Sequence, residues 1–300
     1  MSAPGWTEVR VLVPVGWQEL VAETLAIGPC SSVAFGRPSL ASAPAPEGFE
    51  YVRSFLPSGS DSPALRDEVR RALDALALRA EVEELRGLAL EFRELPPEDY
   101  ARSWMKVWKP FRVGRLAVVA PWRKSTLRAS DLELVLEPGG AFGSGRHATT
   151  RMCMRVLQER LRPGSRLVDA GSGSGILAVS AALLGAREAL GFDIDPNAQP
   201  WAEELARRNG VAERARFQSA GFECLPDLGR FDALVANIYA DVVIEHLGSL
   251  RDALEPGGWF AFSGCTLQHA PAVRAAIEQS GLVLQEVRVR GRWHTFAGIR

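Results

Sequence analysis

The sequence predicts an α/β protein with a doubly wound, mostly parallel sheet, preceded by a small α+β domain. Segments of strand and helix character alternate from Phe111 to the C-terminus, which is typical of a parallel sheet covered on both faces. A glycine-rich turn at 169–175 joins one of these strands to the next helix, as in nucleotide-binding folds. The N-terminal third lacks this alternation, so we expect it to form a separate unit.

The N-terminal domain is expected to span residues 1–95. Polar and apolar residues alternate over 7–13, which predicts a half-buried strand. Leu65, Val69, Leu73 and Leu76 recur at helical spacing and predict an amphipathic helix over 62–80. The remaining expected elements are a helix over 18–26 and strands over 50–56 and 88–95.

Residues 96–110 are expected to form a helical linker, because prolines bound the segment at both ends. Trp104 and Trp108 are four residues apart and share one helical face. We favour packing of this face against a neighbouring domain over a role as a substrate platform. We also expect the linker to act as a hinge between the domains.

The second domain, 111–300, contains the alternating pattern. Strands are expected at 166–169, 189–193, 215–219, 231–236, 258–263, 283–289 and 295–299. Helices are expected at 175–184, 196–209, 241–254 and 270–280, with a further helix ending near Leu161.

Composition excludes several classes of protein. The net charge is -1, which argues against a general nucleic-acid binder. We find neither an apolar run of about 20 residues nor a secretory leader, so a cytoplasmic protein is expected. The four cysteines form no CxxC pair, and neither a metal site nor a disulfide framework is predicted.

The strongest motif is the loop Asp169-Ala-Gly-Ser-Gly-Ser-Gly175 between an apolar strand and a helix. Gly171 and Gly173 let a ligand approach the backbone, and the helix N-terminus favours an anionic group. Ile176 stands where the nicotinamide-dinucleotide fingerprint G-x-G-x-x-G requires glycine. Asp169 also suits a neighbouring cation better than a pyrophosphate.

Two further strands end in polar residues. Asp193 lies about 20 residues after the glycine loop, where an acidic side chain can bind both hydroxyls of a ribose. Asp195 is expected to cap the following helix. Asn237 ends a buried strand, at the sheet edge where ligands gather in open α/β folds.

The segment 138–150 is rich in glycine and carries Phe142, His147, Thr149 and Thr150. Such a segment can wrap a cofactor. Either threonine can equally be only the cap of the helix that follows.

Together these motifs resemble the ribosomal protein L-eleven methyltransferase family (PrmA type). The resemblance covers about two-thirds of the chain and rests on Ala-Phe-Gly-Ser-Gly-Arg-His-Ala-Thr-Thr (141–150), Asp-Ala-Gly-Ser-Gly-Ser-Gly (169–175), Gly-Phe-Asp-Ile-Asp-Pro (191–196) and Ala-Asn-Ile-Tyr-Ala (236–240). It implies a Rossmann-like class I methyltransferase domain with a seven-stranded sheet. It also implies a small N-terminal domain that holds the ribosomal protein, and multiple methylation of lysine and α-amino groups.

The resemblance carries over residue by residue. It implies that Thr150, Gly171, Asp193 and Asn237 contact S-adenosylmethionine, and we add Phe142, Asp169 and Gly173 to the expected cofactor site. The sequence departs from the family pattern at Ser144, Arg146, Ala148 and Tyr239, which affects the details of the pocket.

We expect Asn237 to orient the acceptor amine, which must be neutral to attack. Deprotonation near pH 7.5 costs a lysine about 4 kcal/mol and an α-amine less than about 1 kcal/mol. Three alternatives remain at this point: a lysine methyltransferase for another cytoplasmic protein such as an electron-transfer flavoprotein, a nicotinamide-dependent oxidoreductase, and a non-catalytic binding module. A monomer that needs no membrane and no direct nucleic-acid contact is expected.

Overall fold

The computed structural model describes residues 6–27, 33–35, 45–57, 59, 61–95, 110–122, 127–137 and 145–300. The chain divides into two compact units, and the second begins at Pro110. The expected linker helix and its two tryptophans lie outside the described residues, and so does Phe142.

The N-terminal unit is a four-stranded antiparallel sheet with the strand order β2-β3-β1-β4 and two helices. Val9, Val11 and Val13 alternate along the central strand β1 and are fully buried. Ser62 caps the longer helix by accepting a hydrogen bond from the Leu65 N–H at 3.2 Å. The elements are β1 (Trp6–Pro14), α1 (Gln18–Ile27), β2 (Val33–Phe35), β3 (Phe49–Pro57), α2 (Pro63–Arg79), the short helix η1 (Glu83–Leu85) and β4 (Leu90–Leu95).

The second unit is built on a seven-stranded sheet with the strand order β10-β9-β8-β11-β12-β14-β13. Strands β8 to β12 are parallel to one another, and β14 is antiparallel to both β12 and β13. The strands are β8 (Arg166–Ala170), β9 (Glu188–Asp193), β10 (Ala215–Ser219), β11 (Phe231–Asn237), β12 (Leu254–Thr266), β13 (Val283–Arg290) and β14 (Trp293–Ile299). The expected α/β fold with a mostly parallel sheet of seven strands is therefore confirmed.

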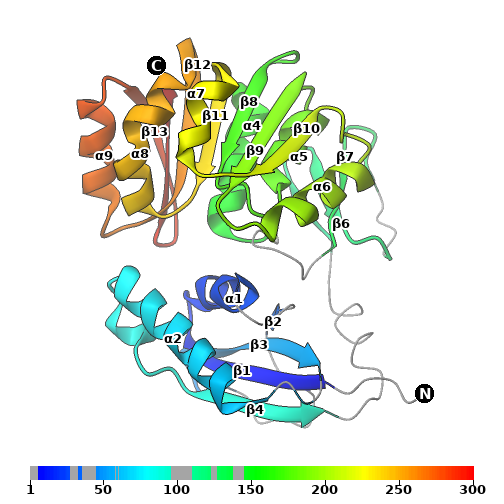
Figure 1. Cartoon of the computed structure of the whole chain (residues 1–300), viewed down its shortest axis with the longest axis vertical. Helices are drawn as coiled ribbons and strands as arrows, with labels where there is room; N and C mark the ends of the chain where they lie inside the picture. Colours follow the sequence, from blue (N-terminus) through cyan, green and yellow to red (C-terminus); the bar gives the residue numbers. More distant parts are fainter. Residues whose placement is uncertain are drawn as a thin grey trace. The chain divides into compact units, whose positions relative to one another are not determined.

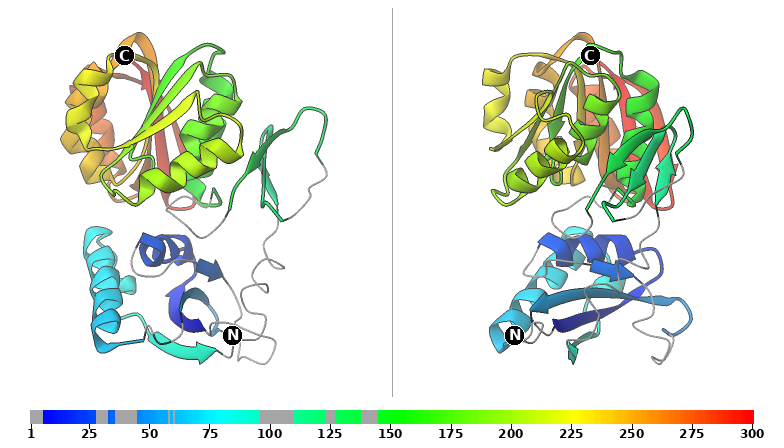
Figure 2. Two further views of the ribbon diagram at one scale, coloured as in Figure 1. Left: turned by 45° about the vertical axis from the view of Figure 1, so that its right-hand side comes forward. Right: turned by 90° about the vertical axis from the view of Figure 1, so that its right-hand side faces the viewer.

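Helices cover both faces of this sheet (Figures 1 and 2). On one face α5 packs against α4 and α6, and on the other α8 packs against α7 and α9. The helices are α4 (Ala148–Arg160), α5 (Ile176–Leu183), α6 (Ala198–Arg208), α7 (Leu225–Leu228), α8 (Ala240–Asp252) and α9 (Ala270–Gln279), with a short helix η2 (Phe222–Cys224) before α7. No helix among the residues the structure describes is long and apolar enough to cross a membrane.

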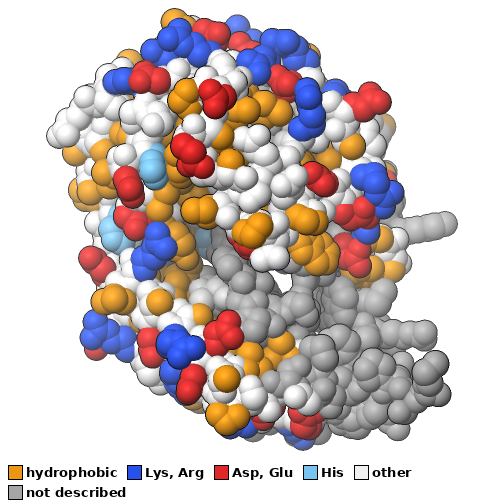
Figure 3. Space-filling model, viewed as in Figure 1, with side chains coloured by type: hydrophobic (Ala, Val, Ile, Leu, Met, Phe, Trp, Pro, Cys, Tyr) orange, Lys and Arg blue, Asp and Glu red, His pale blue; other side chains and the backbone are white. Residues whose placement is uncertain are grey.

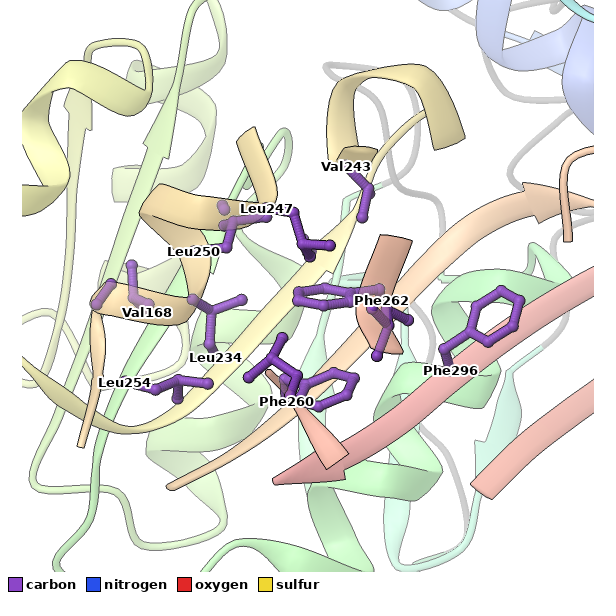
Figure 4. Packing of buried hydrophobic residues seen from close by; sticks show 14 of the residues in the cluster. Val168, Leu234, Val243, Leu247, Leu250, Leu254, Phe260, Phe262 and Phe296 are labelled. Atoms are coloured by element: carbon purple, nitrogen blue, oxygen red, sulfur yellow. The ribbon is translucent and has the colours of Figure 1, made fainter. Parts of the chain in front are cut away.

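An extended apolar core lies between the sheet and the helices α8 and α9. Figure 4 shows Val243, Leu247 and Leu250 of α8 facing Leu234 of β11 and Phe262 of β12. All five side chains are buried, and they belong to one continuous apolar cluster. This core holds β11 and β12 rigidly, which matters because their carboxyl ends contribute to the site described below.

Several local expectations need correction. Three short strands, β5 (Phe111–Val113), β6 (Leu116–Val119) and β7 (Leu132–Val135), form a separate small sheet that the sequence did not reveal. Helix α6 begins after Asn197, so Asp195 is not its cap; the Asp195 carboxylate instead accepts the Asn197 N–H within the preceding turn. His147, and neither threonine, is the cap of α4: its Nδ1 accepts the Thr149 N–H at 3.3 Å.

Candidate functional site

Three neighbouring strands bring the predicted site residues to the same level of the sheet. Asp169 on β8 lies opposite Gly191 on β9 and Val235 on β11. Gly171, Asp193 and Asn237 each lie two residues further along the chain than Asp169, Gly191 and Val235, respectively. Because the strands are parallel, all three residues meet where β8, β9 and β11 end. The strand order reverses between β8 and β11, and such a reversal is where open α/β sheets bind ligands.

The conformation of the glycine loop after β8 depends on its glycines and on backbone hydrogen bonds to β9. Gly171, Gly173 and Gly175 adopt positive φ angles of 71°, 50° and 76°, which side chains with a Cβ disfavour. The N–H groups of Gly171 and Ser172 both donate to the Phe192 carbonyl on β9 at 2.9 Å. The loop is therefore tied to the neighbouring strand and ends at the N-terminus of α5, where backbone N–H groups favour an anionic group.

Asp193 accepts hydrogen bonds through both carboxylate oxygens. The Gly173 N–H donates to Oδ2 at 2.8 Å, and the Asp195 N–H donates to Oδ1 at 2.9 Å. These bonds fix the carboxylate beside the glycine loop, while the residue keeps partial exposure to solvent. A carboxylate has about four acceptor positions, so a ribose diol can bind without displacing either bond.

Asp169 is more buried than Asp193, and its carboxylate accepts fewer hydrogen bonds. It is 1% exposed, and the Ala178 N–H of α5 donates to its Oδ2 at 3.1 Å. Its Oδ1 is also buried and has no hydrogen-bond partner among the described residues. Burial raises the pKa of Asp169 to about 7, the Ala178 bond opposes this rise, and the charge of Asp193 adds to it. A buried carboxylate oxygen in this state fits a bound cation and would repel a pyrophosphate.

Asn237 ends β11 and is buried. Its Nδ2 donates to the Thr150 hydroxyl on α4 at 3.2 Å, so two of the predicted residues, 87 positions apart, are in direct contact. Thr150 is buried in the first turn of α4. This contact fixes the plane of the Asn237 amide beside the glycine loop.

His147 supports the start of α4. It is buried, and its ring lies edge-on to Trp293 of β14 with 4.7 Å between the centroids. Burial lowers the pKa of His147 to about 4, so the ring is neutral near pH 7. A neutral ring is also required for Nδ1 to accept the Thr149 N–H. This residue therefore positions the helix that carries Thr150.

Ile194 lies between the two aspartates at the end of β9 and is not among the residues predicted for the site. Its side chain is 83% exposed, unusual for a large aliphatic residue, and it adjoins the fixed carboxylate of Asp193. The signal was present in Asp-Ile-Asp, since a lone apolar residue between two acids has no capping or ion-pairing purpose there.

The strand order and the glycine–aspartate–asparagine edge define a class I methyltransferase with S-adenosylmethionine as methyl donor. The family model "Ribosomal protein L11 methyltransferase (PrmA)" matches residues 5–300. The chain therefore belongs to the PrmA family, and the expected resemblance is confirmed.

Individual relatives agree with this family. The chain is 36% identical over 302 residues to a ribosomal protein L11 methyltransferase of Pelotomaculum thermopropionicum, covering 97% of this chain and 98% of that one. It is 41% identical over 202 residues to that of Thermus thermophilus, covering 67% and 78%. A crystal structure of ribosomal protein L11 methylase from Lactobacillus delbrueckii subsp. bulgaricus matches with a TM-score of 0.57 and 30% identity, over 63% of this chain and 96% of that one. None of the three alternative functions is supported by these comparisons.

Proposed function

We propose that this enzyme transfers methyl groups from S-adenosylmethionine to lysine and N-terminal amino groups of ribosomal protein L11. The printed names of its relatives identify that acceptor for them. The observation on this chain that carries the proposal is Asn237, an uncharged amide held by Thr150 at the level of Gly171 and Asp193. An amide in this place can orient an amine without favouring its protonated form.

The residues at the edge of the sheet fit the cofactor. Asp193 would accept the two ribose hydroxyls, and Asp169 would face the ammonium group of the methionine part, which supplies the cation that its buried oxygen lacks. The backbone at Gly171 and Gly173 would contact the part of the cofactor that lies between its ribose and its ammonium group. Thr150 would lie next to this part. Ile194 would cover one face of the adenine ring. Phe142 stays a predicted cofactor contact outside the described residues.

The bound cofactor supplies a methyl group on a positively charged sulfur, which is already a good leaving group. The protein therefore has to position a neutral amine, and positioning alone can contribute several kcal/mol, up to roughly 7–11 kcal/mol. The Asn237 Nδ2 is engaged with Thr150, so the amide oxygen Oδ1 is the atom that would accept an amine N–H. The amine loses its proton to bulk water before attack. Its nitrogen lone pair then forms the new N–C bond as the bond from the methyl carbon to sulfur breaks, and S-adenosylhomocysteine is the leaving group.

The N-terminal domain, 1–95, would recognise the acceptor protein, with 96–110 as the linker. Charges of both signs are interspersed over the described surface of the 111–300 domain seen in Figure 3. On the face seen in Figure 3, the described residues therefore form no continuous basic patch of the kind that binds ribosomal RNA. A monomer acting on free ribosomal protein in the cytoplasm is the simplest arrangement.

The test is transfer of radiolabelled methyl from S-adenosylmethionine to purified, unmethylated ribosomal protein L11, followed by intact-mass analysis. We expect mass gains in steps of one methylene group. Peptide mapping should place them on lysine side chains and on the N-terminal amine. Absence of transfer from an enzyme that binds the cofactor normally would contradict this choice of acceptor.

A further inference from the structure

The turn after β11, residues 237–239, is held by a bulge in the next strand. We call these residues the Asn237 turn. The Ile238 N–H donates to the Ser263 carbonyl at 3.1 Å, and Ser263 lies directly opposite Asn237 in the sheet. The Ser263 hydroxyl lies 2.6 Å from the Thr295 hydroxyl on β14 and forms a hydrogen bond with it. Both residues are fully buried. The register of β12 against β14 shifts between Phe262 and Cys265, which defines the bulge.

Gly264 lets this bulge touch the backbone of the Asn237 turn. It has a φ of +89°, and a Cβ at this position would lie 2.1 Å from the carbonyl oxygen of Ile238 and 2.8 Å from its carbonyl carbon. Both atoms belong to the backbone, so no change of rotamer can make room. Any residue larger than glycine therefore forces the backbone of the turn or of the bulge to shift.

Gly171 approaches the same residue from the glycine loop. A Cβ at Gly171 would lie 2.3 Å from Cγ2 of Ile238, which is a side-chain atom. Ile238 therefore occupies the space between two glycines, one in the proposed cofactor loop and one in the β12 bulge. A Cβ at Gly171 would clash with the side chain of Ile238, whereas a Cβ at Gly264 would clash with its backbone.

We infer that Gly264 and Ile238 are positioning residues for methyl transfer. They set the place of Asn237 relative to the glycine loop. This inference rests on the proposed role of Asn237 in orienting the amine. A displacement of about 1 Å at a positioned group can lower a rate about a hundredfold.

The first experiment compares Gly264→Ala with Gly257→Ala, both in β12. Gly257 has a similar φ of +79°, but a Cβ there meets nothing within 4 Å. The pair therefore separates close approach from backbone strain. We expect Gly264→Ala to lower kcat about a hundredfold, with the Kd of S-adenosylhomocysteine changing by less than about threefold. Gly257→Ala should change neither value.

The second experiment uses the difference between side chain and backbone. Gly171→Ala should weaken cofactor binding, and adding Ile238→Ala should recover part of the lost affinity by removing the clashing Cγ2, while the backbone strain at the φ of +71° persists. The same Ile238→Ala change should restore nothing in Gly264→Ala, because the atoms that clash there are carbonyl atoms.

A third readout does not depend on the acceptor. The side-chain amide NMR signals of Asn237 should shift in Gly264→Ala and stay in place in Gly257→Ala. If the wild-type enzyme binds cofactor but does not methylate ribosomal protein L11, the proposed function fails, and this readout still tests the positioning.

Three results would overturn the inference: unchanged Asn237 signals, equal kcat values for Gly264→Ala and Gly257→Ala, or rescue of Gly264→Ala by Ile238→Ala. If Gly264→Ala does not fold, Ile238→Ala alone replaces it. That variant should lower kcat about tenfold with unchanged cofactor affinity. Wild-type kcat in a folded Ile238→Ala enzyme would also contradict the inference.

Discussion

The two sides of the sheet's carboxyl edge differ in charge. The side formed by β8 and β9 carries the carboxylates of Asp169 and Asp193 around the glycine loop. On the side formed by β11 and β12 the polar groups at the strand ends are uncharged, Asn237 with Thr150 and Ser263 with Thr295, and the acid Asp241 follows in the first turn of α8. Carboxylates suit the cationic groups and ribose of the proposed cofactor. A carboxylate beside the acceptor amine would favour its protonated form, which cannot attack. The difference indicates a division of labour between binding and transfer.

The largest expected effect is on the uncharged side. Asn237→Ala should lower the rate of methyl transfer about a hundredfold to a thousandfold, as loss of a positioned polar group does in other enzymes. Single-turnover kinetics with saturating cofactor measure this rate. Because Asn237 is also an expected cofactor contact, isothermal titration should show a smaller loss of affinity than of rate, with the Kd of S-adenosylhomocysteine rising by less than about tenfold. Full turnover in this variant would remove the proposed role of Asn237.

Loss of Asp193 should weaken cofactor binding and leave the transfer rate at saturating cofactor nearly unchanged. Asp193→Ala removes a charged acceptor of hydrogen bonds worth about 1.5–3 kcal/mol, so the Kd of S-adenosylmethionine should rise about tenfold to a hundredfold. The transfer rate at saturating cofactor should recover to near the wild-type value. Asp195→Ala is the matched control, since the Asp195 side chain bonds only within its own turn. Equal weakening of binding by both variants would show that Asp193 has no specific role.

Asp169 predicts a dependence of stability on pH. Its pKa is raised to about 7 in the folded protein, so between pH 4 and pH 7 the folded state holds a proton that the unfolded state has released. Stability from this group is therefore lost as pH rises through that window, by at most about 1.4 kcal/mol per pH unit. Asp169→Asn should remove this loss, so the variant gains stability relative to wild type as the pH increases. Thermal melting of the cofactor-free enzymes at pH 5 and pH 8 measures the gain, and an equal difference at both values would be inconsistent with a buried titrating carboxyl group.

His147 predicts a smaller effect of opposite sign. Its pKa is lowered to about 4 by burial. Between pH 6.5 and pH 4, His147 is therefore protonated in the unfolded state and neutral in the folded state. Stability is lost as pH falls through this window. In the wild type this slope opposes that of Asp169, and the two partly cancel. His147→Asn keeps a side chain that can cap α4 and should leave only the Asp169 slope. Unchanged pH dependence between pH 4 and pH 6.5 would contradict burial of a neutral His147.

Local sequence patterns were sufficient for the charged side of the site. A buried strand, three glycines and a helix follow one another at 166–183, and the acid that ends the next strand lies at a characteristic distance. Each of these features is contained in a few consecutive residues. The strand–loop–helix geometry follows from the local backbone preferences of glycine and from burial of the apolar strand.

The supports of the uncharged side could not be read from the sequence. The contact of Gly264 with Ile238 and the pairing of Ser263 with Thr295 depend on β14 entering the sheet antiparallel between β12 and β13. The sequence leaves a threonine as one possible cap of α4, whereas in the structure His147 is the cap and packs against Trp293, which is far from it in the sequence. Contacts between distant segments, set by packing, leave no local signal.

The most direct test of this division of labour is a crystal structure of the enzyme with S-adenosylhomocysteine. We predict the ribose hydroxyls on Asp193, the ammonium group facing Asp169, and the sulfur directed toward the Asn237 turn. A ligand with its ribose away from Asp193, or with its sulfur far from Asn237, would contradict the assignment of binding to β8 and β9 and of transfer to β11 and β12.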